Sequence, residues 1–257
     1  MGAAPPLTVV TSTYNWPRAL AQAVPTALAQ SYGDFEYLII GDGCTDETED
    51  VVRSFKDSRI RWRNLDENSG NQSGVNKIAL EMARGEFIAY LNHDDLWFPD
   101  HLETVLSPLL ENDFDVVNSV CLEIGAPGHH YRGLIGLPIQ TGPSSVDVTP
   151  MTTSVVHTAS AARTVGGWID WRRTHAIPTL DFFRRLRCLR QRFGIVPAVT
   201  ALKFHSGDRK DSYLQKDASE QQSWAQRMRA DPELRYREIM TALACRAMLE
   251  QAPKIAQ

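Results

Sequence analysis

Apolar and polar positions alternate in blocks along the first hundred residues of the chain. Residues 7–12 (LTVVTS) and 35–43 (FEYLIIGDG) contain the β-branched and aromatic runs that are typical of buried parallel strands. Each run is followed by a segment whose apolar residues recur at helical spacing, at 19–31 and at 45–55. The pattern therefore predicts two successive strand–helix units.

The same alternation continues over the next fifty residues. Residues 60–65 form a third predicted strand, 71–85 a helix that ends at a glycine, and 86–95 a fourth strand. A helix over 101–114 follows. Strands that alternate with helices in this way predict a doubly wound, Rossmann-like α/β fold, with a mostly parallel sheet and helices on both faces.

The second half of the chain has a less regular pattern. Strands are predicted at 115–124 and 195–204, with a helix of basic outer face at 175–194 before the second. Residues 125–150 are rich in glycine and proline, and we interpret them as a functional loop because so long a connection is uncommon in a compact domain. A polar, basic loop at 205–217 precedes a predicted C-terminal helical segment.

Composition supports a folded domain and argues against several functions. The 257 residues are 43% hydrophobic and carry a formal charge of −4, so no overall field favours nucleic acid or an anionic membrane. The four cysteines form no CxxC pair, which argues against a zinc knuckle or a disulfide framework. No stretch approaches the roughly 18 apolar residues of a membrane helix. We expect a cytoplasmic protein without a transmembrane segment, with peripheral membrane attachment as the alternative, and no nucleic-acid partner.

Polar residues gather where the predicted strands end, at 11–15, 42–46 and 92–95. Ligands of such sheets bind at the carboxyl ends of the strands. Asp94 and Asp95 are adjacent carboxylates, which are costly to remove from water unless a cation compensates. Oxygen-rich sites suit Mg²⁺ or Mn²⁺, so the pattern predicts a metal that bridges nucleotide phosphates. The alternative for the pair is a helix N-cap followed by a first-turn acid.

Four segments, in this order, resemble the GT-A glycosyltransferases of sequence family 2. They are VVTSTYN, AQSYGDFEYLIIGDGCTDET, NSGNQSGVNKIALEMARGEFIAYLNHDD and DDLWFPDHLE. The resemblance is dense over about 7–110, and GGW and PTLDFFRR extend it to about residue 190. It implies one GT-A domain over 1–257: about 7–110 bind the nucleotide sugar, about 111–215 bind the acceptor and supply the base, and about 216–257 form a C-terminal helical extension.

The resemblance implies a nucleotide-sugar donor, with UDP-sugars favoured and GDP or dTDP sugars as alternatives. Thr11, Thr13 and Tyr14 border the base pocket and Asp42 hydrogen-bonds the base, since a strand-end carboxylate accepts well from a base N–H and Tyr14 offers a stacking face. The alternative for Asp42 is a turn position, where Asp is common. The other residues assigned to the nucleotide sugar are Asn68, Asn76, Asn92, His93, Arg209 and Lys210.

The resemblance also assigns the metal site. The family pattern at 92–95 is Asp-x-Asp-Asp, and Asp94 holds the position that carries the metal and the diphosphate. Asp95 and His205 complete the expected Mg²⁺ or Mn²⁺ site, with Asp95 as a supporting acid near the start of the next helix. Asn92 replaces the first Asp of the pattern and adds no charge, which predicts weaker metal binding.

A helix start near residue 180 is expected to carry the catalytic base, because inverting transfer needs a carboxylate opposite the leaving diphosphate to take the acceptor's proton. The resemblance assigns this role to Asp181. An alignment shifted by two residues puts Thr179 at that position and leaves Asp170 or Asp181 as substitutes. Trp168, after two glycines, resembles the family's acceptor-side aromatic, with a core position as the alternative.

The basic loop after the last predicted strand is expected to close over the diphosphate. Arg209 and Lys210 would neutralise phosphate oxygens, with His205 at the metal; the alternative is a solvated charged surface. His157 and His175 are expected to be structural.

The leading function is an inverting, metal-assisted transfer of a sugar from a nucleoside-diphosphate sugar to the hydroxyl of a glycan, a lipid-linked or a small natural-product acceptor. A sugar nucleotidyltransferase is one alternative, although the segment TSTYNWPRAL lacks the glycines of its phosphate loop. A non-catalytic nucleotide-sugar or glycan-binding module is another, given Asn92 and the sparse acids at 178–181. A homodimer is among the assemblies expected.

Overall fold

A nine-stranded sheet organises the protein, in the order β3-β2-β1-β4-β10-β6-β11-β5 with β7 paired to β6. The computed structural model describes residues 6–111, 114–137, 150–174, 176–205, 209 and 211–251, and the backbone of 139–142 and 145–147. The strands are β1 (Leu7–Thr13), β2 (Phe35–Gly41), β3 (Ile60–Asn64), β4 (Phe87–Tyr90), β5 (Leu96–Trp97), β6 (Val116–Ile124), β7 (Arg132–Ile135), β10 (Val155–Thr158) and β11 (Phe193–Phe204). A separate hairpin pairs β8 (Ile139–Gly142) with β9 (Ser145–Asp147).

Most strands of the sheet run in the same direction. β3, β2, β1 and β4 are mutually parallel, and β6 and β11 share their direction because β10 lies antiparallel between β4 and β6. Only β10, β5 and β7 of this sheet run the other way. This arrangement confirms the predicted α/β class with a mostly parallel sheet.

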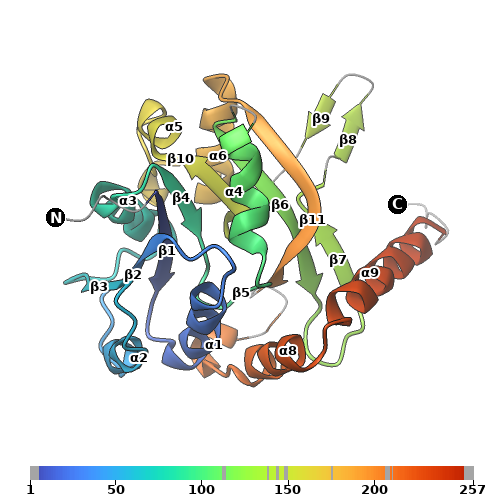
Figure 1. Ribbon diagram of the computed structural model, residues 1–257, viewed down its shortest axis with the longest axis horizontal. Helices are drawn as coiled ribbons and strands as arrows, with labels where there is room; N and C mark the ends of the chain where they lie inside the picture. Colours follow the sequence, from blue (N-terminus) through green and yellow to red (C-terminus); the bar gives the residue numbers. More distant parts are fainter. Residues whose placement is uncertain are drawn as a thin grey trace.

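Helices cover both faces of the sheet, as the sequence predicts (Figure 1). Helices α1, α2 and α4 pack on one face, and α3, α5 and α6 on the other. The helices are α1 (Pro17–Leu28), α2 (Thr48–Ser54), α3 (Gln72–Met82), α4 (His101–Glu111), α5 (Ala159–Thr164), α6 (Pro178–Cys188), α7 (Ser212–Gln215), α8 (Ser219–Ala230) and α9 (Leu234–Gln251), with 3₁₀ turns η1 (Thr152–Ser154) and η2 (Trp171–Arg173).

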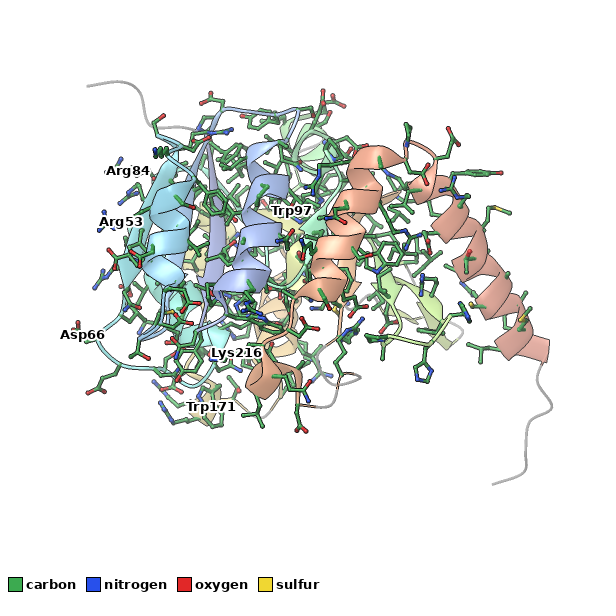
Figure 2. All side chains as sticks on the ribbon, turned by 90° about the horizontal axis from the view of Figure 1, so that it is seen from below. Arg53, Asp66, Arg84, Trp97, Trp171 and Lys216 are labelled. Atoms are coloured by element: carbon green, nitrogen blue, oxygen red, sulfur yellow. The ribbon has the colours of Figure 1, made fainter. Side chains whose placement is uncertain are left out.

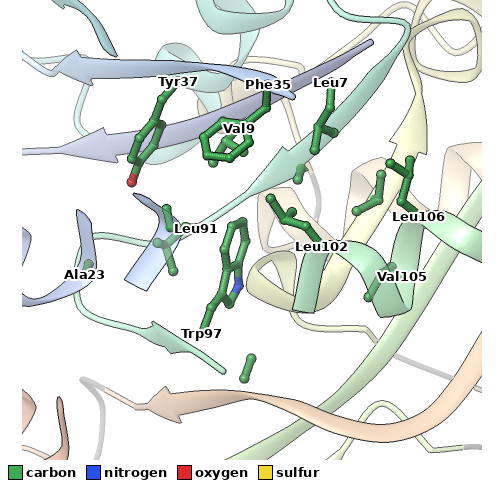
Figure 3. Packing of buried hydrophobic residues seen from close by; sticks show 14 of the residues in the cluster. Leu7, Val9, Ala23, Phe35, Tyr37, Leu91, Trp97, Leu102, Val105 and Leu106 are labelled. Carbon is green, nitrogen blue, oxygen red and sulfur yellow. The ribbon is translucent and has the colours of Figure 1, made fainter. Parts of the chain in front are cut away.

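The core has one layer on each side of the sheet because successive strand residues point to opposite faces. Val9 of β1 lies in the cluster under α1 and α4, whereas Val10 lies in the cluster under α3 and α6. In the first cluster Trp97 lies among apolar residues that include Leu91 and Leu102 (Figure 3). Its indole N–H donates to the Thr153 carbonyl at 2.7 Å, which ties η1 to β5.

The second half of the chain differs in detail from the sequence-based expectation. Residues 125–150 contain β7, β8 and β9 in addition to loop, and the basic loop at 205–217 contains the short helix α7. The C-terminal extension consists of two helices, since Pro232 follows the end of α8 and cannot continue a helix. In Figure 1, α9 projects at the edge of the molecule beside β7. No helix within the described residues is both long enough and apolar enough to cross a membrane.

Candidate functional site

The carboxyl ends of β1, β2, β3 and β4 meet at one end of the sheet. In Figure 2, Asp66, Trp171 and Lys216 lie at this end, while Arg84, which precedes β4, lies at the opposite end. The loops after the four strands therefore bring the three predicted polar clusters together, as a parallel sheet requires.

Buried polar atoms without a hydrogen-bond partner mark the same end of the sheet. Such atoms are few in folded proteins, and each one indicates a water, an ion or a ligand that completes it. Within the described residues, five of the seven such side chains lie on segments that meet this end: Thr13, Trp16, Ser73, His93 and Thr153.

Asp42 follows β2 and is 5% exposed. One of its carboxylate oxygens accepts from the Ser69 backbone N–H at 2.8 Å, and its carbonyl accepts from the Asn68 side chain at 3.0 Å. These bonds hold the loop after β3 against the loop after β2. Tyr14 is 44% exposed at the end of β1, with the Lys216 ammonium 5.6 Å from its ring centroid. A carboxylate and an accessible aromatic ring thus lie at adjacent strand ends.

Thr11 and Asn76 are buried below this surface. The Thr11 hydroxyl donates to the Leu91 carbonyl at 2.7 Å and lies 2.9 Å from the Tyr37 hydroxyl. These contacts join β1, β2 and the end of β4. Asn76 is 2% exposed on α3. Thr11 was expected from the sequence to border the base. Its hydroxyl instead forms hydrogen bonds within the sheet.

The adjacent carboxylates Asp94 and Asp95 have different environments. Both oxygens of Asp95, which is fully buried, lie 3.1 Å from the Lys203 ammonium; one also accepts from the Phe204 N–H at 3.1 Å and the other from the Asn92 amide at 2.8 Å. Asp95 was expected to help to bind the metal, but both of its oxygens already accept hydrogen bonds within the protein. The Asp94 carboxylate is 5% exposed and accepts no hydrogen bond from any described residue.

Electrostatics keep the Lys203–Asp95 pair charged at neutral pH. Burial disfavours the ammonium, but the carboxylates of Asp95 and Asp94 outweigh burial and raise the pKa of Lys203. Burial is also the largest influence on Asp95 and, against the opposing effect of Lys203, raises its pKa to about 6. Asp94 lies beside this pair and its carboxylate also helps to keep the Lys203 ammonium charged, so two carboxylates share one lysine at the end of β4.

His93, between Asn92 and Asp94, is buried and neutral. Burial lowers the pKa of its imidazole, and the negative charge of Asp94 opposes this only in part. Its ring meets Trp16 edge-on at a centroid distance of 5.4 Å, and Trp16 meets Tyr213 of α7 at 5.3 Å. These aromatic contacts place α7 beside the Asp94 loop. His93 Nδ1 has no partner in the described structure.

A divalent ion fits this site only if a substrate supplies most of its ligands. Among the described residues, no three His, Cys, Asp or Glu side chains are grouped so as to hold a metal by themselves. Asp94 supplies one carboxylate, and Mg²⁺ is commonly bound by one or two carboxylates together with substrate phosphates and water. Asp94 is the residue that would hold such an ion.

His205 and Arg209 both have protein partners after the end of β11. His205 Nε2 lies 3.1 Å from a Glu123 oxygen. The Arg209 guanidinium pairs with Glu220 at 2.7 Å and donates to the carbonyls of His205 and Ile124. Neither residue is positioned here as the expected metal ligand or phosphate contact, because both have protein partners. Lys210 and His175 lie outside the described residues.

The start of α6 places Thr179 against α3 and η1, while Asp181 pairs along its own helix. Thr179 accepts from the Gln72 amide at 3.2 Å and lies 3.1 Å from the Thr152 hydroxyl, so α3, η1 and α6 converge on it. Asp181 pairs with Arg185 at 2.9 Å, one turn along α6, and Arg185 also donates to the Val165 carbonyl. Its other carboxylate oxygen accepts no hydrogen bond within the described residues.

Two tryptophans three residues apart have opposite environments. Trp168 is 1% exposed; it donates to the Tyr90 hydroxyl at 2.9 Å and stacks on Phe182 at 4.5 Å. The Tyr90 hydroxyl lies 3.0 Å from His157 Nε2, which makes His157 structural, as expected. Trp168 is therefore a core residue, which was the alternative to its role as an acceptor-side aromatic. It offers no exposed face to an acceptor. Trp171, which the sequence reasoning did not single out, is 43% exposed.

Sequence reasoning also missed Lys203 and Ser69. Lys203 carried a signal, because it is a charged residue inside the apolar strand segment TALKF, and lysine is almost never buried without a partner. Ser69 carried none, because it contacts Asp42 and Trp171 through its backbone, which any residue possesses.

The fold and site define a GT-A type glycosyltransferase architecture: an α/β sheet with an acidic, nucleotide-type site at its carboxyl edge. The model of the family described as "Glycosyl transferase family 2" matches residues 8–187 of the chain. The chain belongs to this family.

Two curated relatives match part of the chain. "UDP-Glc:alpha-D-GlcNAc-diphosphoundecaprenol beta-1,3-glucosyltransferase WfgD" of Escherichia coli is 32% identical over 107 residues, or 42% of this chain and 42% of that protein. "Putative teichuronic acid biosynthesis glycosyltransferase TuaG" of Bacillus subtilis is 38% identical over 109 residues, or 42% of this chain and 43% of that protein. The matched segment thus spans about two fifths of these relatives.

Solved structures share the fold over almost the whole chain. TarS 1–349 of S. aureus in complex with UDP has a TM-score of 0.65 at 15% identity, covering 93% of this chain and 70% of that one. Mannosyltransferase PcManGT of Pyrobaculum calidifontis, in complex with GDP-Man and Mn²⁺, has a TM-score of 0.61 at 16% identity, covering 98% and 77%. The likeness confirms the GT-A fold.

Proposed function

We propose that this protein is an inverting glycosyltransferase that moves a sugar from a nucleoside-diphosphate sugar to an acceptor hydroxyl, assisted by Mg²⁺ or Mn²⁺. The observation that carries the proposal is Asp94: it is almost buried at the end of β4, accepts no hydrogen bond from the described residues, and lies beside an Asp95 that Lys203 already neutralises. With two nearly buried carboxylates and one lysine, a further cation would stabilise the site, and a nucleotide diphosphate would supply the remaining ligands.

The donor would lie across the carboxyl edge of the sheet. Asp42 accepts from the base, Tyr14 stacks on it after displacing the Lys216 ammonium, and Asp94 holds the metal end. The bound metal would neutralise charge that develops on the departing diphosphate. The family match, and the nucleotides that the titles of the TarS and PcManGT structures name, support this class of donor.

A UDP-sugar donor and a lipid-linked acceptor are the substrates we favour. The name of WfgD specifies UDP-Glc and a diphosphoundecaprenol-linked sugar, and that protein is 32% identical to this chain over 107 residues.

Asp181 remains the proposed general base, with Asp170 and Thr179 as its competitors. Asp181 keeps one carboxylate oxygen unbonded within the described residues, whereas Asp170 caps η2 and is bound by Arg172. Thr179 faces Gln72 and Thr152, and its hydroxyl does not ionise at neutral pH. Asp181→Asn should lower kcat by about 10²–10⁴-fold if it is the base, and Asp170→Asn or Thr179→Ala by much less.

A ligand-stability assay followed by a turnover assay tests the function. UDP, GDP, dTDP and CDP sugars should be screened for an increase in melting temperature with and without Mn²⁺, since a specific ligand stabilises the folded state. Asp94→Asn should remove the Mn²⁺-dependent part of the shift and abolish donor turnover. Asp34→Asn, an exposed change at the opposite end of the sheet, is the matched control.

Three outcomes would contradict the proposal. Donor binding without turnover in both wild type and Asp94→Asn would indicate a binding module. Release of pyrophosphate with formation of a nucleotide sugar would indicate a nucleotidyltransferase. A product that retains the stereochemistry of the donor would exclude the inverting mechanism.

A further inference from the structure

A pocket, here called the Trp171 pocket, lies between α3 and residues 166–173. Its volume is about 270 Å³, and its lining includes Ser69, Gly74, Lys77, Trp171, Arg172 and Arg173. Ligand pockets usually measure about 300–1,000 Å³, so this one is slightly smaller than most of them. It has room for a single sugar ring and not for a nucleotide sugar.

Trp171 forms a fixed aromatic wall of this pocket. Its indole N–H donates to the Ser69 carbonyl at 3.2 Å, and the Arg172 guanidinium lies 5.4 Å from its ring centroid. Gly70, with φ of +81°, lies against the ring: a Cβ at Gly70 would be 3.4 Å from Trp171 Nε1. A large aromatic side chain that is held at its edge but remains 43% exposed offers a prepared surface for the C–H face of a sugar.

The pocket carries an excess of positive charge. Lys77, Arg172 and Arg173 line it together with one carboxylate, Asp170. Asp170 is occupied by Arg172, through the backbone N–H at 2.9 Å and the guanidinium at 3.2 Å. Within the described residues, neither the Lys77 ammonium nor the Arg173 guanidinium forms a hydrogen bond or a close ion pair. Arg173 acts on Asp170 only through its charge, so the exposed Lys77 and Arg173 can both contact an anionic group on a ligand.

The Trp171 pocket is joined to the predicted base-binding loop through one residue. The Ser69 N–H donates to the Asp42 carboxylate at 2.8 Å, while the Ser69 carbonyl accepts from Trp171 at 3.2 Å and from Arg172 at 3.4 Å. A ligand that fixes Trp171 and Arg172 would thus also fix the peptide that positions Asp42. We expect binding in the pocket and nucleotide binding to reinforce one another.

We propose that the Trp171 pocket binds an anionic monosaccharide unit, carrying a carboxylate or a phosphate, as part of the acceptor. The ring stacks on Trp171 and the negative group lies near Lys77 and Arg173. That the sugar belongs to the acceptor rests on the proposed transferase function; the binding of an anionic sugar does not.

Direct binding measurements test this inference, with glucuronate, glucose 6-phosphate and glucose as the probes. Calorimetry on wild type should give about threefold to tenfold tighter binding for at least one anionic probe than for glucose. Trp171→Ala should weaken every probe by about threefold to tenfold. The double variant Lys77→Gln/Arg173→Gln should remove the preference for the anionic probe and leave glucose binding unchanged. Arg229→Gln, an exposed arginine on α8, is the charge control, and Tyr236→Ala, exposed on α9, is the aromatic control.

The outcomes separate the two anions and the two proposals. Preference for glucuronate alone assigns a carboxylate, and preference for glucose 6-phosphate alone assigns a phosphate. Equal binding of glucose and both anionic probes, or a preference that survives in the double variant, overturns the inference. UDP is measured in parallel: UDP binding without anionic-sugar binding overturns the pocket alone, whereas anionic-sugar binding without any nucleotide binding contradicts the transferase and leaves the pocket standing.

Discussion

The buried Lys203–Asp95 pair should be a main contributor to the stability of the site, and Lys203→Met tests this. The substitution keeps an unbranched side chain of similar length and removes only the ammonium. Asp95 is fully buried and the Lys203 side chain 12% exposed, so no water replaces the lost charge. Removing one partner of a buried ion pair costs about 3–5 kcal/mol, because the other charge is left uncompensated. Because Asp95 retains hydrogen bonds from Asn92 and Phe204, we expect the free energy of unfolding to fall by about 3 kcal/mol.

The loss should depend on pH in a defined direction. Burial already raises the pKa of Asp95 to about 6 although Lys203 lowers it, so removal of Lys203 raises it further. A carboxyl whose folded pKa exceeds its unfolded value of about 3.9 favours folding below that value, and the contribution disappears as pH rises through the folded pKa. Lys203→Met should therefore be more destabilised at pH 8 than at pH 5.5, where Asp95 can take up a proton.

Urea denaturation at pH 8 and pH 5.5 measures the effect. The double variant Asp95→Asn/Lys203→Met should recover most of the loss, because it removes the charge that the single change leaves unpaired. The control is Arg246→Met, whose partner Glu250 is 65% exposed on α9; its cost should stay below about 0.5 kcal/mol. A loss below about 1 kcal/mol for Lys203→Met at pH 8, or an equal loss at both pH values, would refute the reasoning.

Three further predictions concern the pH response, the core and the nucleotide loop. Burial lowers the pKa of His101 to about 3 and that of His157 to about 4. As pH falls from 7 to 5, the imidazole of the unfolded chain takes up a proton near pH 6.5, so each histidine should lower the free energy of unfolding by about 2 kcal/mol. Denaturation at a series of pH values measures how the free energy of unfolding depends on pH. Trp168→Ala should cost about 3–5 kcal/mol in urea denaturation by leaving a cavity beside Phe182. Gly43→Ala should weaken UDP binding in a thermal-shift titration, because Gly43 has φ of +71° and its Cβ would lie 2.7 Å from the Asn68 nitrogen.

Strands β1, β2 and β4 of the parallel half were predictable because each is a local, mostly apolar run. Residues 35–41 are buried throughout, and such a run identifies a strand without knowledge of its partners. β7 was not predictable in the same way: it has four residues, all half-buried, and it exists because it pairs with β6 at the edge of the sheet. The two-residue β5 likewise depends on pairing with β11, about 100 residues later. Short strands of this kind are determined by their partner and not by their own sequence.

The roles of Asp94 and Asp95 show where sequence reasoning about the site reaches its limit. The two residues are chemically identical and adjacent, and the turn after β4 was predictable from either. What distinguishes them is Lys203, which is 108 residues away along the chain and meets Asp95 only because β11 pairs with β5.

The same argument applies to Trp168 and Trp171. Gly166 and Gly167 both have positive φ, 78° and 69°, and the turn that they form leads one indole into the core under α6 and the other to the surface beside Ser69. A family pattern fixes which residue types stand near the site, but the long-range contacts decide which of two like residues faces a ligand. For this chain they assign the free carboxylate to Asp94 and the accessible ring to Trp171, so variants of these two residues separate donor binding from acceptor binding most directly.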